Sequence, residues 1–399
     1  AALALLTGGV SVAADWAQWR GPNRDGKSAE TGLLKKWPAG GPKLVWSVDG
    51  IGRGFAQAIV AGGQVYVTGE TNGEGRCSAF DLDGTLKWKL EYGREWDKRH
   101  AGSRTMPTVH DGRAYIVSAY AVVTCFDAKT GKNLWQVDMT KRFGAKLIMW
   151  GNAESVLIDG DNVICTPGGK NVMMAALNRK TGETVWKTGG LAGASSYCSP
   201  ILIERGGTRL IATITSHHII GVEAATGKLL WGHPYGNQRR NHPITPVCAD
   251  GMIYCTSGYG KGGVMLELSA DGKDVTQRWA EERPDTRHGG VVLVAGYVYG
   301  SAQSRRGKWY CVELKSGKVM WEADIVGEGS MALADGLFYC YGERGKLALV
   351  EMSPDGHKVI SSFQITRGKD PHWAHPSISG GRLYIRHGDV LMAYDIKAD

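Results

Sequence analysis

The chain has 399 residues, 57 of them glycine, with only 22% charged residues and a formal net charge of +8. Its length allows a large buried core. The many turn-forming glycines and the Val, Ile, Tyr and Trp content favour strands, and long helical charge patterns are hard to find. Beyond the first fourteen residues, no stretch approaches the length of a membrane-spanning helix.

The first fourteen residues, AALALLTGGVSVAA, are apolar and end in small residues before Asp15. This pattern is typical of the end of a secretory signal peptide, with cleavage after Ala13 or Ala14. The alternative is a tag-like extension. We therefore expect residues 1–14 to be a residual signal peptide and the protein to be periplasmic or extracellular. Export argues against a nucleic-acid partner, and a lipoprotein anchor would need a cysteine where Asp15 stands.

Residues 15–42 precede the first repeated unit and contain the phrase WAQWRGPNRDG. Arg20, Arg24 and Asp25 of this phrase fit a cap over one face better than a functional site. We predict that this segment is an N-terminal cap over one face of the fold.

A hydrophobic phrase, a tight turn and an aromatic residue recur along the rest of the chain. The phrase reads FDLDGTLKW at 80–88, FDAKTGKNLW at 126–135, LNRKTGETVW at 177–186, VEAATGKLLW at 222–231 and VELKSGKVMW at 312–321, with longer turns at 266–279 and 350–363. The aromatic residues stand at 46, 88, 135, 186, 231, 279, 321 and 363, so they are 42 to 51 residues apart. Such a period, with four short strands per unit, is typical of a β-propeller.

The last copy of the phrase, MAYDIKAD at 392–399, ends before its aromatic residue. The missing strand is KLVWSVDG near the start, which carries Trp46. We therefore predict an all-β fold: a single eight-bladed β-propeller over residues 43–399, with the last blade closed by the N- and C-terminal strands so that no sheet edge stays open. The competing count is seven blades, if the unit of Phe363 is degenerate.

The phrase A-x-D-x-x-T-G-x-x-x-W resembles the tryptophan-docking motif of the pyrroloquinoline quinone (PQQ) type propellers. That group includes quinoprotein alcohol dehydrogenases and a propeller lipoprotein of the outer-membrane assembly machine. WAQWRGPNRDG, ESVLIDGDNVICTPGGKN (154–171) and HGGVVLVAGYVYG (288–300) are similar to secreted bacterial PQQ-like propellers. The resemblance covers nearly all of the chain after residue 14. It implies the fold but leaves the activity open, because the motif is structural.

The eight cysteines follow the repeat rather than a disulfide framework. Cys165, Cys255 and Cys340 occupy equivalent places, and Val67 stands there in the first copy. A cysteine that alternates with valine is expected to be a small buried hydrophobic residue. Cys248 and Cys255, which flank one expected hairpin, are the single pair for which a bridge stays open.

Chemistry is expected in the loops that lead into the first strand of each blade, because these loops converge around the central channel. Arginine and histidine gather in them, which predicts a basic funnel that attracts anionic ligands. The alternative is a set of solvated loop charges. Trp150, Tyr197 and Trp373 also lie in these loops, where aromatic faces suit a sugar or a planar cofactor. The candidate ligand-binding residues are Arg53, Arg104, Trp150, Asn152, Tyr197, Arg240, His242, Arg287, Trp373 and His375.

Two candidates for catalysis are Glu154 and His288. Glu154 lies near the start of the first strand of a blade, beside Trp150 and Asn152, where burial would raise its pKa and make it a general base or a metal ligand. The alternative is a glutamate paired with a neighbouring arginine. His242, His288, His372 and His375 could meet from separate blades at a metal, but no pair has metal-ligand spacing and we predict no metal site.

Three functions remain open. The first is a monomeric binding module for a small anionic ligand, a glycan or an envelope protein. The second, implied by the resemblance, is a PQQ-dependent alcohol or sugar dehydrogenase with Ca²⁺. Its usual ligand pattern is not seen, because the stretch that matches the calcium ligand offers Lys170 and Asn171 but no Glu, and no adjacent cysteines occur, so the cofactor stays unknown. The third is an enzyme that uses Arg, His and Glu154 on an anionic glycan.

Overall fold

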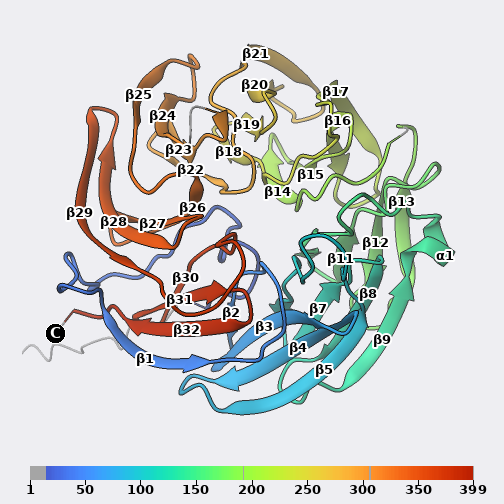
Figure 1. Ribbon diagram of the computed structural model, residues 1–399. Helices are drawn as coiled ribbons and strands as arrows, with labels where there is room; N and C mark the ends of the chain where they lie inside the picture. Colours follow the sequence, from blue (N-terminus) through green and yellow to red (C-terminus); the bar gives the residue numbers. More distant parts are fainter. Residues whose placement is uncertain (1–14, 192, 305–306, 399) are drawn as a thin grey trace, which may run out of the picture.

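The computed structural model describes residues 15–191, 193–304 and 307–398. The expected signal remnant at 1–14 lies outside the described residues. Eight four-stranded antiparallel sheets stand around a central axis (Figure 1), which confirms the eight-bladed propeller. The eighth sheet excludes the seven-bladed alternative.

The strands follow the repeat in chain order. The first two blades contain β2 (Ile59–Ala61), β3 (Gln64–Thr71), β4 (Glu74–Asp81), β5 (Leu86–Arg94), β6 (Thr108–His110), β7 (Arg113–Val117), β8 (Val122–Asp127) and β9 (Asn133–Asp138). The next two contain β10 (Leu157–Asp159), β11 (Asn162–Cys165), β12 (Met174–Asn178), β13 (Thr184–Thr188), β14 (Ile201–Arg205), β15 (Thr208–Ile214), β16 (His218–Glu223) and β17 (Leu229–Pro234).

The second half of the ring repeats the pattern. Blades five and six contain β18 (Val247–Ala249), β19 (Met252–Ser257), β20 (Gly262–Leu268), β21 (Val275–Glu281), β22 (Val291–Val294), β23 (Tyr297–Ser301), β24 (Trp309–Glu313) and β25 (Val319–Ala323). Blades seven and eight contain β26 (Gly329–Ala334), β27 (Leu337–Gly342), β28 (Lys346–Ser353), β29 (Gly356–Gln364), β30 (Ser377–Ser379), β31 (Arg382–His387), β32 (Val390–Asp395) and, from the other end of the chain, β1 (Lys43–Val48). One short helix, α1 (Met139–Phe143), follows β9.

The repeated turn and its aromatic residue tie each blade to the next. In the second blade, the Asp127 carboxylate accepts hydrogen bonds from the backbone N–H and the hydroxyl of Thr130, which closes the turn between β8 and β9. The indole of Trp135 donates to the Arg179 carbonyl of the third blade at 3.1 Å. A Cβ on Gly182 would lie 2.8 Å from the ring of Trp135, and Gly182 has φ +74°. The repeat needs glycine here because the next blade's turn packs against the indole.

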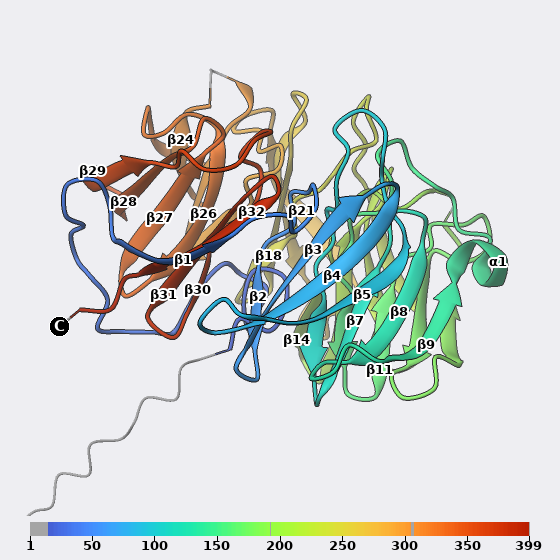
Figure 2. The same ribbon diagram turned by 60° about the horizontal axis from the view of Figure 1, so that its bottom comes forward.

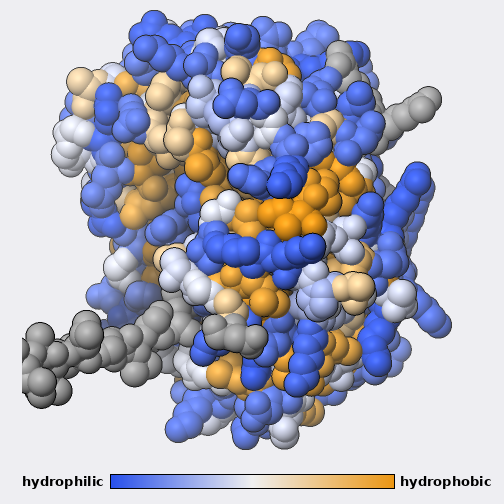
Figure 3. Space-filling view, turned by 90° about the vertical axis from the view of Figure 1, so that its left-hand side faces the viewer, coloured by the Kyte–Doolittle hydropathy of each residue, from blue (hydrophilic) through white to orange (hydrophobic). Residues whose placement is uncertain are grey.

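The ring is closed by the two ends of the chain. β1 pairs with β32 in antiparallel register, with Trp46 opposite Ala393. Trp46 also donates to the Leu82 carbonyl of the first blade at 2.7 Å. The predicted closure by N- and C-terminal strands is confirmed. Figure 3 shows the side of the ring where the C-terminus lies, and its hydrophilic surface is broken by hydrophobic patches.

In the segment 15–42 (dark blue in Figures 1 and 2), Trp16 and Lys27 bridge the innermost strands β2 and β26. Residues 33–42 run outward to the edge of blades seven and eight, where the Trp37 N–H donates to the Ser361 hydroxyl. Trp16 is 1% exposed and forms a bridge with Val60 of β2. The buried guanidinium of Arg24 donates to the carbonyls of Ser155 at 2.7 Å and Val156 at 2.9 Å. The N-terminal segment therefore contacts blades on different sides of the axis and links them.

All eight cysteines are free thiols, and all but Cys248 are buried. Cys248 and Cys255 are not bridged. The burial of the seven cysteines other than Cys248 agrees with the prediction that cysteine replaces small hydrophobic residues in the repeat. The helices of the described ranges include none long and apolar enough to cross a membrane.

Candidate functional site

The loops between blades meet around a cavity of about 250 Å³ at one end of the channel. Seven of these loops contribute to its lining, together with the N-terminal segment and the hairpin between β19 and β20. The lining residues are Trp19, Phe55, His100, Arg104, Met106, Trp150, Ala153, Tyr197, Ser199, Asn241, Pro243, Tyr259, Arg287, His288, Trp373 and His375. The site is thus built from residues that are distant in sequence.

The wall of the cavity is largely aromatic, and Trp373 is at its centre. The ring of Trp373 lies 4.9 Å from that of Phe55, 5.3 Å from that of His100 and 5.1 Å from that of His288. His100 continues the wall to Trp150, with the ring centroids 5.7 Å apart. Five loops therefore present flat ring faces to the same space, an arrangement that suits a ring-shaped ligand.

The N-terminal segment contributes to the cavity through Trp19. This indole lies 4.6 Å from the ring of His375 and donates to the Thr245 hydroxyl at 2.8 Å. His375 is 4% exposed, and burial lowers its pKa to about 3. His375 is therefore neutral at physiological pH, and the pair forms an uncharged surface.

Arg104 supplies a cation beside the aromatic wall. Its guanidinium lies 5.4 Å from the centre of the Phe55 ring and donates to the carbonyls of His100 and Gly102. Burial lowers the pKa of Arg104, but an arginine stays charged at neutral pH. Because a guanidinium has five N–H groups, donors remain for a ligand.

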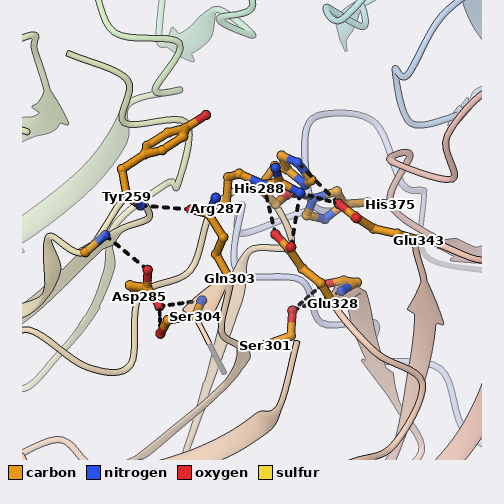
Figure 4. Close-up of polar contacts among 12 residues, drawn as sticks. Tyr259, Asp285, Arg287, His288, Ser301, Gln303, Ser304, Glu328, Glu343 and His375 are labelled. Carbon is orange, nitrogen blue, oxygen red and sulfur yellow. Dashed lines mark hydrogen bonds and ion pairs between the residues drawn. The ribbon is translucent and has the colours of Figure 1, made fainter. Parts of the chain in front are cut away.

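Arg287 is held by two carboxylates on the opposite wall (Figure 4). Its guanidinium binds both oxygens of Glu328 at 3.0 Å and one oxygen of Glu343 at 2.9 Å. Desolvation by burial, with the neighbouring Glu343 as a second cause, raises the pKa of Glu328 to about 7. With both acids ionised, the three residues carry a net negative charge, so this wall is not the strongly basic surface that was expected of the funnel.

His288, Glu328 and Glu343 have ligand atoms within 4.8 Å of one another, so they are the group of described residues that could hold a metal ion. Arg287 already binds both carboxylates and offsets part of their negative charge. The four histidines considered from sequence do not form one group: His375 Nε2 lies 2.9 Å from the His288 carbonyl oxygen, but the other two have partners elsewhere. His242 bonds to Ser257 at 3.0 Å, and His372 stacks on His387 at 3.5 Å.

Tyr197 has an unusual backbone conformation beside the cavity. Its φ is +72°, although it is not glycine, and its side chain is 8% exposed. The phenol oxygen accepts a hydrogen bond from the backbone N–H of Trp150 at 3.2 Å. Non-glycine residues at positive φ are uncommon and gather at functional sites. Tyr197 therefore positions the loop that carries Trp150.

Six of the sequence candidates lie at the cavity: Arg104, Trp150, Tyr197, Arg287, Trp373 and His375, and the catalytic candidate His288 joins them. The other four ligand-binding candidates do not line it. Arg53 pairs with Glu70 at 2.7 Å, Asn152 accepts from the Glu154 N–H at 2.8 Å, Arg240 is exposed, and His242 is fully buried.

Glu154 lies behind the cavity wall rather than in it. It is 1% exposed, and its carboxylate accepts from the backbone N–H of Thr166 at 3.0 Å and from the Thr166 hydroxyl at 3.2 Å. Desolvation raises its pKa to about 8, as expected for a buried acid, and Arg24 opposes the shift only weakly. The carboxylate is therefore engaged with Thr166 and does not meet His288, and its proposed role as a base stays untested.

Sequence reasoning missed several lining residues, among them Trp19, Phe55, His100 and Tyr259, and both acids that bind Arg287. Phe55 and His100 stand in loops that were singled out for their arginines. Tyr259 has φ +61° at the tip of its hairpin. The aromatic content of each loop, weighed alongside its charge, would have found them.

A second hollow of about 460 Å³ is lined by residues 23–27 and by turns of blades four to six. It contains no aromatic ring, and its side chains include Asn23, Lys27 and Asp250. The aromatic cavity offers the better-defined contacts for a small ligand, so we take it as the candidate site.

Comparison with known proteins gives relatives of two kinds. The model of the family described as outer membrane protein assembly factor BamB matches residues 74–323. BamB of Moranella endobia is 25% identical over 274 residues, which cover 62% of this chain and 64% of that protein. The quinoprotein ethanol dehydrogenase of Pseudomonas aeruginosa is 26% identical over 163 residues, 38% of this chain and 25% of the enzyme. The chain thus spans less than two thirds of the length of either relative.

Two solved structures have the same fold. The crystal structure of BamB from Moraxella catarrhalis matches with a TM-score of 0.62 at 16% identity, over 89% of this chain and all of that one. The quinohemoprotein alcohol dehydrogenase from Comamonas testosteroni matches with a TM-score of 0.71 at 12% identity, over 96% of this chain and 80% of that one. At this identity the likeness shows the fold alone.

Proposed function

The chain belongs to the family of the outer membrane protein assembly factor BamB, a family of PQQ-like propellers, and from this premise we propose that it is an exported, monomeric, non-catalytic binding module. Its axial cavity binds a small ligand that has a flat apolar face and an acidic group. The observation that carries this proposal is the aromatic wall around Trp373 with the Arg104 cation beside it.

The size and chemistry of the cavity favour a single acidic ring. A volume of about 250 Å³ lies below the usual range of roughly 300–1,000 Å³ for ligand pockets. Trp150 and Trp373 offer faces on which the apolar side of a ring can stack. Arg104 can bind a carboxylate through charge-assisted hydrogen bonds. Uronic acids and aromatic carboxylates combine both features.

The quinoprotein reading requires PQQ and Ca²⁺, and the residues at the cavity do not fit that pair. A calcium site needs several oxygen ligands. The acids at the wall, Glu328 and Glu343, are bound to Arg287, and His288 completes their group with a nitrogen. The same acids repel a multiply charged carboxylate. We therefore derive no redox step for this protein.

Enzymatic attack on an anionic glycan is also disfavoured by the positions of the acids. Glycoside hydrolysis ordinarily uses two carboxyl groups, one on each side of the scissile bond. Glu154 is buried outside the cavity, and Glu328 and Glu343 lie together on one wall with Arg287 between them. Binding without chemistry needs none of these acids.

The test is a titration followed by tryptophan fluorescence and calorimetry. Glucuronate, galacturonate and benzoate are compared with glucose and benzyl alcohol, which lack the acid, and PQQ is titrated with and without Ca²⁺. We expect at least one acid to bind and its neutral counterpart to bind about tenfold more weakly or worse, as the loss of a charge-assisted contact implies. PQQ should give no calcium-dependent signal.

A matched pair of variants locates the site. Arg104→Met should abolish the preference for the acid, whereas Arg240→Met, which removes an exposed arginine outside the cavity lining, should bind like wild type. Equal binding of acids and neutral rings, or equal loss in both variants, would contradict the proposal. Tight binding of PQQ that requires Ca²⁺ would restore the dehydrogenase.

A further inference from the structure

An apolar loop stands out of the surface next to the cavity. It comprises residues 144–150 and follows α1 directly. Met149 is 63% exposed and Leu147 is 51% exposed, the two highest values among the large hydrophobic residues described. The other exposed hydrophobic residues near this level are separate positions on outer strands. Exposure of adjacent large apolar side chains marks a surface that meets a partner.

The loop is fixed at both ends, so its apolar residues are held outward. At its start, the Asp138 side chain caps α1, Phe143 is buried, and Gly144 ends the helix with φ +67°. At its end, the backbone N–H of Trp150 donates to the Tyr197 hydroxyl. A chain anchored in this way cannot fold Leu147 and Met149 inward without losing those contacts.

Basic and aromatic side chains surround the loop. Trp96 lies 6.2 Å from Trp150, with Lys98 over its ring at 5.6 Å. The turn at Gly169 packs against Gly144, which brings Lys170 next to the loop. We call this surface the basic apolar patch, and its members are Trp96, Lys98, Arg99, Lys141, Arg142, Lys146, Leu147, Ile148, Met149, Trp150 and Lys170.

The patch has a clear excess of positive charge. Its six cations are all exposed. The acids nearby include Asp97 and Glu183, both exposed, and Asp138, which caps the helix and pairs with Lys141 at 3.4 Å. Even with every one of these acids ionised, the cations remain in the majority, so a partner that covers the patch must be anionic as well as apolar.

We propose that the basic apolar patch docks on the surface of a membrane that contains anionic lipids. Leu147 and Met149 enter the boundary between headgroups and acyl chains, Trp96 and Trp150 lie at the headgroup level, and the cations bind lipid phosphates. Four of the six cations are lysines, which protein–protein interfaces deplete and anionic membrane surfaces attract. This chemistry favours a lipid surface over a protein partner.

Docking there brings the cavity to the membrane, because Trp150 ends the loop and also lines the cavity. The inference does not depend on the proposed ligand. It rests on the exposure of Leu147 and Met149 and on the surrounding charge, so failure of ligand binding leaves it intact.

The test is flotation of the purified chain with vesicles of phosphatidylcholine alone or with phosphatidylglycerol added. We expect binding to the anionic vesicles only, weakening as salt is raised. Leu147→Ser combined with Met149→Ser should lower the partition coefficient about tenfold, because each buried apolar group contributes to interfacial binding. Lys146→Glu should lower it by about fivefold or more, because each cation near the surface contributes about that factor.

The matched control combines Leu86→Ser with Val359→Ser, two exposed hydrophobic residues on β5 and β29. It should bind vesicles like wild type. Lack of binding to anionic vesicles would overturn the proposal. So would binding that the Leu147 and Met149 changes leave unaltered, since that would be a general charge effect. If vesicles do not bind and a photocrosslinker at position 149 captures an envelope protein, the patch belongs to a protein partner.

Discussion

Arginines at two levels of the channel have different roles. Arg20 and Arg24 are 1% and 3% exposed, and their guanidinium groups donate to backbone carbonyls of the ring. These hydrogen bonds join the N-terminal segment to the ring. Arg104 and Arg287 stand at the cavity, where one bonds its own loop and the other binds two acids. The arginines bonded to carbonyls of the ring are structural, and Arg287 is held by two acids, whereas Arg104 keeps donors for a ligand at the cavity.

The largest effect is expected from Arg24→Met. Removal of the guanidinium leaves the Ser155 carbonyl buried without its donor and separates the N-terminal segment from the third blade. We expect the free energy of unfolding to fall by about 3 kcal/mol, as for loss of a buried charged hydrogen-bond donor. Chemical denaturation measures it, with Arg240→Met at an exposed loop position as the control. An unchanged midpoint would show that the segment is not bonded to the ring in this way.

The second effect is on binding. Trp373→Ala removes the ring that contacts Phe55, His100 and His288. We expect affinity for the acidic ligand to fall about tenfold or more, because aromatic contacts contribute about 1 kcal/mol beyond the area they bury. Since Trp373 is a loop residue, the unfolding midpoint should move much less than for Arg24→Met. Calorimetry on both variants separates the two roles, and a Trp373→Ala protein that binds normally would remove the aromatic wall from the site.

A smaller effect is expected from Tyr197→Phe. The change keeps the ring and removes the hydroxyl that accepts from the Trp150 N–H. Loss of one such hydrogen bond costs about 1 kcal/mol, so ligand affinity should fall about fivefold through greater freedom of the Trp150 loop. A positioning role also predicts that the fluorescence of Trp150 changes before any ligand is added. If neither quantity moves, the strained backbone of Tyr197 serves another purpose.

The smallest effect is a pH dependence that comes from Glu328. Because its pKa is raised to about 7 in the folded protein, it takes up a proton as pH falls through 7. Protonation of Glu328 removes one of the two negative charges that offset the positive charge of Arg287. An acidic ligand should therefore bind about threefold more tightly at pH 6 than at pH 8. The same raised pKa means that Glu328 makes the protein less stable as pH rises from its unfolded pKa, near 4.5, to about 7.

Glu328→Gln isolates this dependence from the other buried acids. Glu95 and Glu154 also have raised pKa values, of about 7 and about 8, but neither binds Arg287; burial also raises the pKa of Glu343, which stays in place in this variant. The variant should bind the ligand with little change between pH 6 and pH 8. A full pH dependence in Glu328→Gln would assign the proton to another group.

The blades and the cavity also differ in how far sequence predicts them. The turn and the aromatic residue recur because most of the indoles pack on the next blade's glycine, as Trp135 does on Gly182; the indole of Trp321 does not, since a Cβ on Gly356 would have no neighbour within 4 Å. That periodicity predicts the number of blades and the closure by β1 and β32. The loops have no period. Trp150, Tyr197 and Trp373 were found because they interrupt the repeat, and their role in binding stays a prediction.

The sequence did not predict how deep along the channel each loop residue lies. Alternation along a strand separates the two faces of a blade but not the level at which a loop residue stands. Glu154 lies in the loop, three residues before β10 begins at Leu157, and Asn152 accepts a hydrogen bond from the Glu154 backbone N–H. The partners Glu328 and Glu343 come from loops of the seventh blade, and no local pattern joins them to Arg287.

The most direct test of the central claim is a crystal structure of the protein soaked with the acid that binds in the titration. We predict that the ring lies against Trp373 and Trp150 with its carboxylate on Arg104. A ligand found in the polar hollow beside residues 23–27, or a carboxylate bound away from Arg104, would contradict the assignment of the aromatic cavity as the binding site.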